Sequence, residues 1–159
     1  MEVAELREGI VVGIFMGLAD VHVNRAPIAG VVKRIVHTRR RPSMSMWRMT
    51  INDILGKNAF PVPGQHVVKN TRNAVLIEGE FPVCVLQIAD RHVGRILCYP
   101  KEGQEVVAGE RIGMITFGSQ VDLFLPKDKY ALSVKVGDRV KAGSSIIARL
   151  IHEPIAAGL

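Results

Sequence analysis

Aromatic side chains and cysteines are scarce in this chain of 159 residues, which is 5% aromatic and has two cysteines. With so few stacking surfaces and no recognition-helix pattern beside its basic residues, the chain is a poor candidate for nucleic-acid binding. Cys84 and Cys98 both lie in apolar segments typical of strands, which predicts buried free thiols rather than a disulfide framework. A reducing, cytoplasmic location is therefore expected.

Long apolar runs are absent as well. The longest, around Ile10–Leu18, falls well short of the roughly 20 residues that a transmembrane helix needs. The N-terminal residues Met1–Glu5 contain no basic region of the kind that opens a cleaved secretory signal. We therefore expect a cytoplasmic protein that meets a membrane only at its periphery.

The usual catalytic signatures are also missing. The chain contains no G-x-S-x-G elbow, no H-E-x-x-H, no C-x-x-C and no P-loop. Its histidines show no metal-ligand spacing, so no metal site is predicted; they are His22, His37, His66, His92 and His152.

Positive charge is in excess, at a formal +6, and part of the excess is local. A local cluster of basic residues favours the binding of polyanions, among them phospholipid headgroups. The segment that follows, Pro42–Gly64, is rich in methionine and suits either a membrane interface or a loop folded over the core. The candidate membrane patch consists of Arg39, Arg40, Arg41 and Trp47, with Lys33 and Arg34 nearby; a solvated loop is the alternative.

Glycine and valine are frequent, helix signals are few, and short apolar runs alternate with turn residues. This pattern predicts a mainly β fold, with Asp20–Ala26 as a loop or tight turn. The expected strands are Gly9–Phe15, Gly30–His37, Asn73–Glu78, Pro82–Ile88, Val93–Tyr99, Arg111–Thr116, Gln120–Leu125 and Ser145–Ile151.

One internal repeat is clear, because residues 103–112 match residues 137–146 at an offset of 34. Both copies read G-x-x-V-x-A-G, and their glycines suit turns that need positive φ. Paired hairpins of this kind are typical of the barrel-sandwich fold of lipoyl and biotinyl carriers. We therefore predict one domain, 1–159, with a barrel-sandwich β core and a long excursion loop.

Two stretches stand out as candidate sites. In the first, Asp20, His22 and Asn24 alternate with valines, so an extended chain would project all three to one side. Histidine suits proton transfer near neutral pH, although a hydrogen-bonded turn is an equally good interpretation of this stretch. In the second, Gly118-Ser119 lies where one apolar strand ends and another starts; a Gly-Ser pair alone carries little information.

Together, the two stretches resemble the phosphatidylserine decarboxylases, especially their short bacterial and archaeal branch, which includes archaetidylserine decarboxylases. Asp20–Pro27 reads D-V-H-V-N-R-A-P, and Gly109–Pro126 is similar to the family's G-E-R-x-G-M-I-x-F-G-S-R-V-D-L-Y-L-P. Shorter similarities lie between them, at Gly56–Phe60, Arg72-Asn73 and Val85–Ala89. The resemblance extends over roughly Val11 to Leu150.

The resemblance implies a lyase that matures by cleaving itself between Gly118 and Ser119. Residues 1–118 would form a β chain and residues 119–159 an α chain, with a pyruvoyl cofactor made from Ser119. It also implies decarboxylation of phosphatidylserine or archaetidylserine, with His22 handling the proton. Arg25 and Asn24 are the candidates for substrate binding, although Arg25 is equally suited to a structural role and Asn24 more to shaping the turn. An anionic membrane surface is the expected partner, and an exposed edge strand would favour a homodimer.

The chain departs from the family's pattern at several places. It has no S-P-A-D-G motif before the first expected strand, Lys69-Asn-Thr-Arg-Asn73 replaces E-N-E-R-N, and Gln120 replaces the common arginine. A fragment, a partner that supplies the missing acid, and a relative that does not process itself all remain open. The alternatives to an enzyme are a lipid-surface module and a carrier domain, for which Lys129 would be the modified lysine.

Overall fold

The computed structural model describes residues 9–17, 19–40, 45–46, 51–52, 55, 65–91, 95–116 and 119–151. The described part is mainly β, as predicted, and its strands pair antiparallel. The elements are β1 (Gly9–Met16), β2 (Val23–Arg25), β3 (Gly30–Thr38), α2 (Gln65–Lys69), β4 (Arg72–Glu78), β5 (Pro82–Ala89), β6 (Ile96–Cys98), β7 (Glu105–Val106), β8 (Arg111–Ile115), β9 (Ser119–Pro126), β10 (Tyr130–Leu132) and β11 (Ala148–Leu150).

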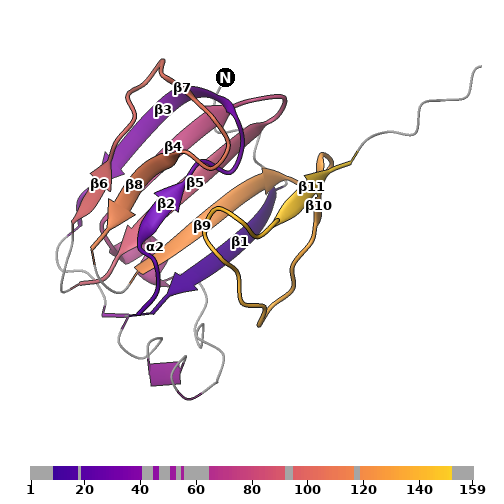
Figure 1. Ribbon diagram of the computed structural model, residues 1–159. Coiled ribbons are helices and arrows are strands. Elements are labelled where there is room, and N and C mark those ends of the chain that lie inside the picture. Colours follow the sequence, from indigo (N-terminus) through magenta and orange to yellow (C-terminus); the bar gives the residue numbers. More distant parts are fainter. Residues whose placement is uncertain are drawn as a thin grey trace, which may run out of the picture.

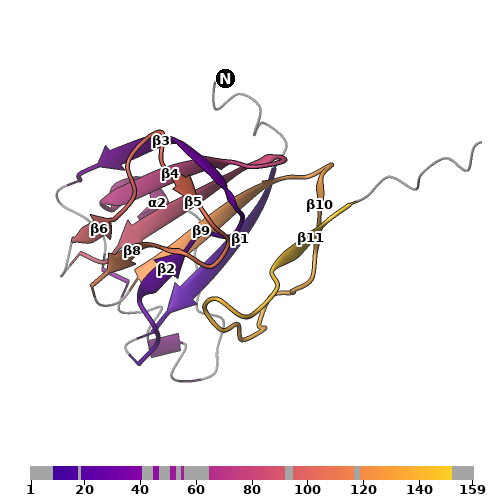
Figure 2. The ribbon, with the colours of Figure 1, turned by 45° about the horizontal axis from the view of Figure 1, so that its top comes forward.

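Two sheets form the body of the molecule. The larger has the strand order β1-β9-β5-β4-β3-β7, and the smaller has the order β2-β8-β6. Figures 1 and 2 both show β2, β6 and β8 lying over one face of the six-stranded sheet. A third sheet, made of β10 and β11 alone, stands to one side of this pair.

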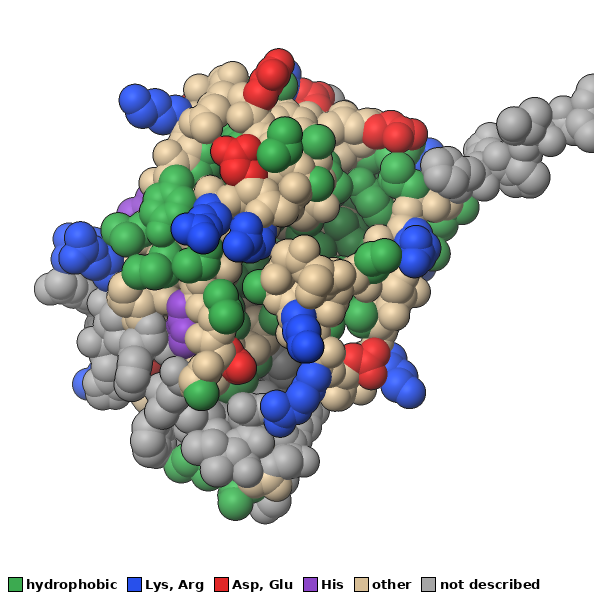
Figure 3. Space-filling model, viewed as in Figure 1, with side chains coloured by type: hydrophobic (Ala, Val, Ile, Leu, Met, Phe, Trp, Pro, Cys, Tyr) green, Lys and Arg blue, Asp and Glu red, His purple; other side chains and the backbone are tan. Residues whose placement is uncertain are grey.

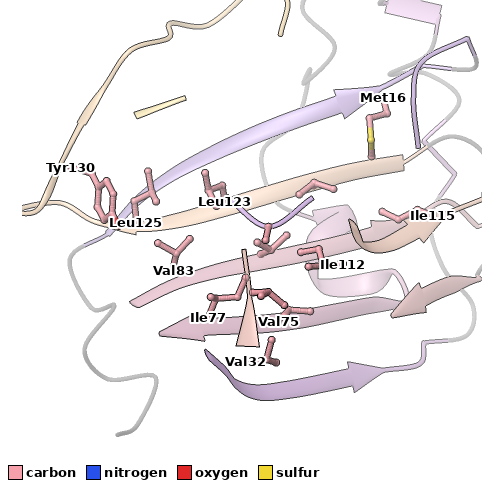
Figure 4. Packing of buried hydrophobic residues seen from close by; sticks show 14 of the residues in the cluster. Met16, Val32, Val75, Ile77, Val83, Ile112, Ile115, Leu123, Leu125 and Tyr130 are labelled. Carbon is pink, nitrogen blue, oxygen red and sulfur yellow. The ribbon is translucent and has the colours of Figure 1, made fainter. Parts of the chain in front are cut away.

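The hydrophobic core fills the space between the two larger sheets. Figure 4 shows Val75, Ile77 and Leu123 of the six-stranded sheet together with Ile112 and Ile115 of β8. In β4 buried and partly exposed residues alternate, as expected for a strand with one face on a core. Strand β9 lies between β1 and β5, and seven of its eight residues are buried. Its position makes Ser119 part of the interior.

The prediction of a loop at Asp20–Ala26 is wrong for its second half. Residues Val23–Arg25 form β2, which pairs with β8 through Val23↔Met114 and Asn24↔Gly113. A three-residue strand is too short to show a period of two, and only its partner in the fold defines it. The sequence prediction also missed α2, β7 and β10, which are similarly short.

The expected strands are otherwise present, with some changes of length. Of the expected strand Val93–Tyr99, the described part contains β6 at Ile96–Cys98, and Val93 and Gly94 lie outside the described residues. The expected strand Ser145–Ile151 is shorter, at Ala148–Leu150. Cys84 and Cys98 are free thiols in β5 and β6, as predicted, although each is only partly buried. No helix in the described ranges is long and apolar enough to cross a membrane.

Both copies of the repeat form the predicted turns, because their four glycines, Gly103, Gly109, Gly137 and Gly143, have positive φ. Their surroundings differ. The first copy packs onto the core through Ile112, which is 1% exposed, whereas the equivalent residue of the second copy, Ile146, is 50% exposed. Equivalent local sequences therefore make the same turns but only one of them joins the main core.

Candidate active site

The two candidate stretches lie side by side because β2 pairs with β8. The carbonyl of His22 accepts a hydrogen bond from the amide of Ile115 at 3.2 Å, one residue beyond the Val23↔Met114 pair. Ile115 ends β8, and Ser119 begins β9 four residues later. Residues almost a hundred positions apart in the chain are thus brought to the same end of the sandwich.

Ser119 is fully buried and its hydroxyl is unsatisfied. It pairs with Met16 of β1 on one side and with Ala89 of β5 on the other. Along β9, Ser119 alternates with Gln120 and shares the side of Val121, which belongs to the core cluster. Its Oγ has no hydrogen-bond partner among the described residues. A buried hydroxyl without a partner costs free energy, which makes Ser119 a candidate functional residue.

One ring nitrogen of His22 is hydrogen-bonded, and the other has no hydrogen-bond partner in the described part of the chain. Its Nδ1 lies 2.7 Å from the carbonyl oxygen of Asp20, and because that oxygen only accepts, Nδ1 carries the hydrogen. In the neutral ring Nε2 then has the lone pair, and this atom is buried and has no partner within the described part of the chain. Asp20 itself closes a turn, since its Oδ2 accepts the amide of Gly17 at 2.8 Å.

Asn24 and Arg25 both have partners inside the protein. Asn24 Oδ1 accepts a hydrogen bond from Gln87 Nε2 at 2.7 Å. Arg25 Nη1 donates to the carbonyl of Gly109 at 2.7 Å, and its Cδ lies against Gly143. Arg25 therefore connects β2 to equivalent glycines of the two repeat copies, and these contacts support the structural alternative for this side chain.

A second polar group lies on the opposite face of β9. His66 Nε2 donates to Gln120 Oε1 at 2.7 Å, and Gln120 Nε2 donates to Asp122 Oδ1. Burial raises the pKa of the Asp122 carboxyl, while the Gln120 hydrogen bond and the positive charge of His66 partly offset that rise. The glutamine that departs from the family's arginine is thus one member of a buried hydrogen-bonded set.

Comparison with known proteins places these residues in a family. A family model described as "Phosphatidylserine decarboxylase" matches residues 1–148. The chain belongs to the phosphatidylserine decarboxylase family. It is 40% identical over 137 residues to a protein of Methanococcoides burtonii named "Putative archaetidylserine decarboxylase proenzyme", covering 86% of this chain and 57% of that protein.

Two bacterial members of the decarboxylase family, both named "Phosphatidylserine decarboxylase proenzyme", match at a similar level. The protein of Desulfotalea psychrophila is 36% identical, over 91% of this chain and 60% of its own length. The protein of Burkholderia mallei is 35% identical, over 93% of this chain and 62% of its own length. The chain thus spans about 60% of the length of these relatives. No solved structure gives a significant match.

The predicted basic patch of this decarboxylase family member is only partly described. Arg39 and Arg40 follow β3 and are exposed, and the amide of Arg40 donates to Thr71 Oγ1 at 3.2 Å. Arg41, Trp47 and Gly118 lie outside the described residues. On the face shown in Figure 3, Lys and Arg side chains are spread over the surface.

One methionine of the excursion segment is part of the interior. Met46 is 1% exposed, and its amide donates to Asp90 Oδ2 at 2.5 Å. Asp90 directly follows Ala89, the partner of Ser119 in β5. For Met46, then, the interpretation as a side chain folded over the core holds, and its amide is bonded next to the candidate site.

Sequence reasoning assigned no role to the buried polar residues that support the site. These are His66, Asn70, Asn73, Gln87, Asp90 and Asp122. A signal was available for some of them, since Gln87 interrupts the apolar run Val85–Ala89 in a strand buried on both faces. Most of their partners could not be read from the sequence, because most of the hydrogen bonds connect segments that are far apart in the chain.

Proposed function

We propose that this protein is a pyruvoyl-dependent decarboxylase of a serine-headed phospholipid, matured by self-cleavage between Gly118 and Ser119. One observation carries the proposal. The two buried polar atoms without hydrogen-bond partners in the described residues are Ser119 Oγ and His22 Nε2, and they come from the two motifs that resemble the family. One is a nucleophile and the other is a base with a free lone pair.

For maturation, Ser119 Oγ would attack the carbonyl carbon of Gly118 and convert the amide bond into an ester. Elimination would then break the bond between Cβ and Oγ of residue 119 and release residues 1–118 with a carboxylate. Uptake of water and loss of ammonia at residue 119 complete the pyruvoyl group. The buried, unsatisfied hydroxyl fits this chemistry, because it has no other hydrogen bond to give up before it attacks.

The two chains would remain associated after cleavage. Strand β9 would be the first element of the α chain, yet it is hydrogen-bonded to β1 on one side and to β5 on the other, both of which belong to the β chain. Its side chains Val121, Leu123 and Leu125 also belong to the common core. Separating the chains therefore requires breaking the main sheet.

For decarboxylation, a pyruvoyl group at residue 119 supplies a carbonyl system that accepts the electrons of the bond to the departing carbon dioxide. His22 is the candidate for returning a proton to the substrate carbon. Its Nδ1–H is held by the Asp20 carbonyl, so proton exchange is directed to Nε2. Burial of Ser119 limits the access of bulk water to the reacting group.

The substrate class follows from the relatives' names, which specify phosphatidylserine and archaetidylserine. We propose an anionic membrane surface as the place of encounter, with Arg39 and Arg40 as exposed cations beside it. Peripheral membrane attachment from the cytoplasm and a homodimer belong to the same proposal. A carrier role is less favoured, because Lys129 is paired with Asp128 and its ammonium lies 5.2 Å from the centre of the Phe81 ring.

The test is the intact mass of the expressed chain under denaturing conditions. The expected result is two products, residues 1–118 and 119–159, the smaller with a blocked N-terminus. Ser119→Ala should remain whole, whereas the exposed Ser133→Ala, a matched control, should cleave normally. The cleaved protein should release carbon dioxide from phosphatidylserine vesicles, and His22→Gln should slow that release by about 10²–10⁴-fold. A single full-length mass for the unmodified chain would contradict the proposal.

A further inference from the structure

Three buried amide side chains connect the two sheets next to the candidate site. Asn73 in β4 and Gln87 in β5 belong to the six-stranded sheet, and Asn24 in β2 belongs to the three-stranded sheet. Their exposed fractions are 1%, 0% and 8%. We refer to these three residues as the amide bridge.

The hydrogen bonds of the amide bridge run in one direction. Asn73 Nδ2 donates to Gln87 Oε1 at 3.0 Å, and Gln87 Nε2 donates to Asn24 Oδ1 at 2.7 Å. Asn24 Nδ2 then points to the sulfur of Met16, 3.7 Å away. Gln87 uses both its acceptor and its donor, and Asn24 uses its acceptor and places its donor against the Met16 sulfur, so the orientation of each amide is determined by its neighbours.

Gly113 makes room for the bridge. It is the partner of Asn24 in the β2–β8 ladder, and a Cβ at this position would lie 2.6 Å from Gln87 Nε2 and would also collide with the carbonyl of Leu97. Only a residue without a side chain lets Gln87 cross β8 and reach Asn24. The glycine of the motif and the bridge are therefore parts of one arrangement.

Both catalytic candidates lie near the Asn24 end of the bridge. His22 is two residues before Asn24, and the neighbouring Asp20 and Val21 are exposed, so Asn24 is the nearest buried anchor of this segment. At this same end, Met16 contacts Asn24 and is the direct partner of Ser119 in the sheet. A shift of Asn24 would move His22 relative to Ser119.

We propose that Asn24, Gln87 and Asn73 are positioning residues that hold His22 Nε2 in register with Ser119. Apolar side chains would fill the same space without the cost of burying three amides, but they would not determine the position of β2 by directed bonds. The significance of this role for catalysis rests on the proposed function. The geometric part, that the bridge determines the state of the His22 ring, can be tested without any activity.

The geometric test uses the uncleaved Ser119→Ala chain and nuclear magnetic resonance of its histidine rings, with His22 assigned through His22→Gln. The unmodified bridge should give His22 with Nδ1 protonated in its neutral form. Gln87→Met, which keeps the length of the side chain but removes both its donor and its acceptor, should change the tautomer populations of His22.

Gln120→Met is the matched control, because Gln120 is also a buried glutamine in the six-stranded sheet but lies on the opposite face, bonded to His66. It should leave the His22 signals unchanged. If Gln87→Met does not fold, Gln87→Glu keeps the acceptor for Asn73 and removes only the donor to Asn24. A lower melting temperature with unaltered His22 signals would show that the bridge is merely structural and would overturn the proposal.

The catalytic test measures carbon dioxide release by the cleaved protein. Gln87→Met should lower kcat by about 10- to 100-fold and leave KM close to its original value, because misplacement of a reacting group affects the chemical step. A rise in KM with unchanged kcat would contradict the positioning role. If the proposed function itself is wrong, the chain with Gln87 unchanged will already be uncleaved and inactive.

Discussion

Replacing Gly113 with alanine tests the close approach of the two sheets. The added Cβ would lie 2.6 Å from Gln87 Nε2 and would collide with the backbone carbonyl of Leu97, which cannot rotate away. The strands β6 and β8 would have to separate, and Gln87 would lose its bond to Asn24. We therefore expect Gly113→Ala to destabilise the fold.

The size of this effect can be worked from its parts. Overpacking costs about 1–3 kcal/mol, and leaving a buried hydrogen bond unmade costs about 1–3 kcal/mol. The lower entropy of the unfolded alanine chain offsets about 0.4–1 kcal/mol of this. The net loss is about 3 kcal/mol, which lowers the melting temperature of a chain of this length by about 6–12 °C.

The assay is thermal and urea unfolding of the Ser119→Ala chain with and without Gly113→Ala. Gly103→Ala is the control, because Gly103 has a φ of 83° and no neighbour within 4 Å, so only backbone strain of about 1–2 kcal/mol is added. In the double variant with Gln87→Ala, the penalty at Gly113 should shrink, since one of the two colliding groups is gone. A loss at Gly113 no larger than that at Gly103 would refute the reasoning.

Three further predictions concern other parts of the molecule. Because burial raises the pKa of Asp122, its contribution to stability is fully present below its unfolded-state pKa and is lost as pH rises through its folded-state pKa. Asp122→Asn should therefore flatten that part of a plot of the free energy of urea unfolding against pH. An unchanged slope would argue against this assignment. Burial raises the pKa of Cys84 from 9.0 to about 11. At pH 8 the thiolate fraction of Cys84, and with it the rate of alkylation, should therefore be about 100-fold lower in the native protein than in the urea-unfolded protein. Equal rates would contradict this. Arg25→Ala should speed amide exchange around Gly109 without raising KM, because Arg25 donates a hydrogen bond to the carbonyl of that turn; a higher KM with unchanged exchange would instead identify Arg25 as a phosphate ligand.

Local features of the fold were predictable because their causes are local. The positive φ of Gly103 and Gly137 follows from the turn sequence around each glycine, and the apolar runs of β5 and β9 predict strands buried on both faces. The departure at Gln120 was visible in the same way. Its bond to His66 was not, because the two residues are 54 positions apart in the chain and only the fold brings α2 beside β9.

The sequence by itself determined the family, the mainly β character and the identity of Ser119 and His22 as candidates, since these depend on residue types and their order. Only the tertiary structure decided that β2 is a strand, that Arg25 bonds to Gly109, and that Asn73, Gln87 and Asn24 join the two sheets. Each of these depends on a partner supplied by a distant segment. Hydrogen bonds and burial arise between segments, so a short polar stretch has no definite structure or role until the fold places its partner beside it.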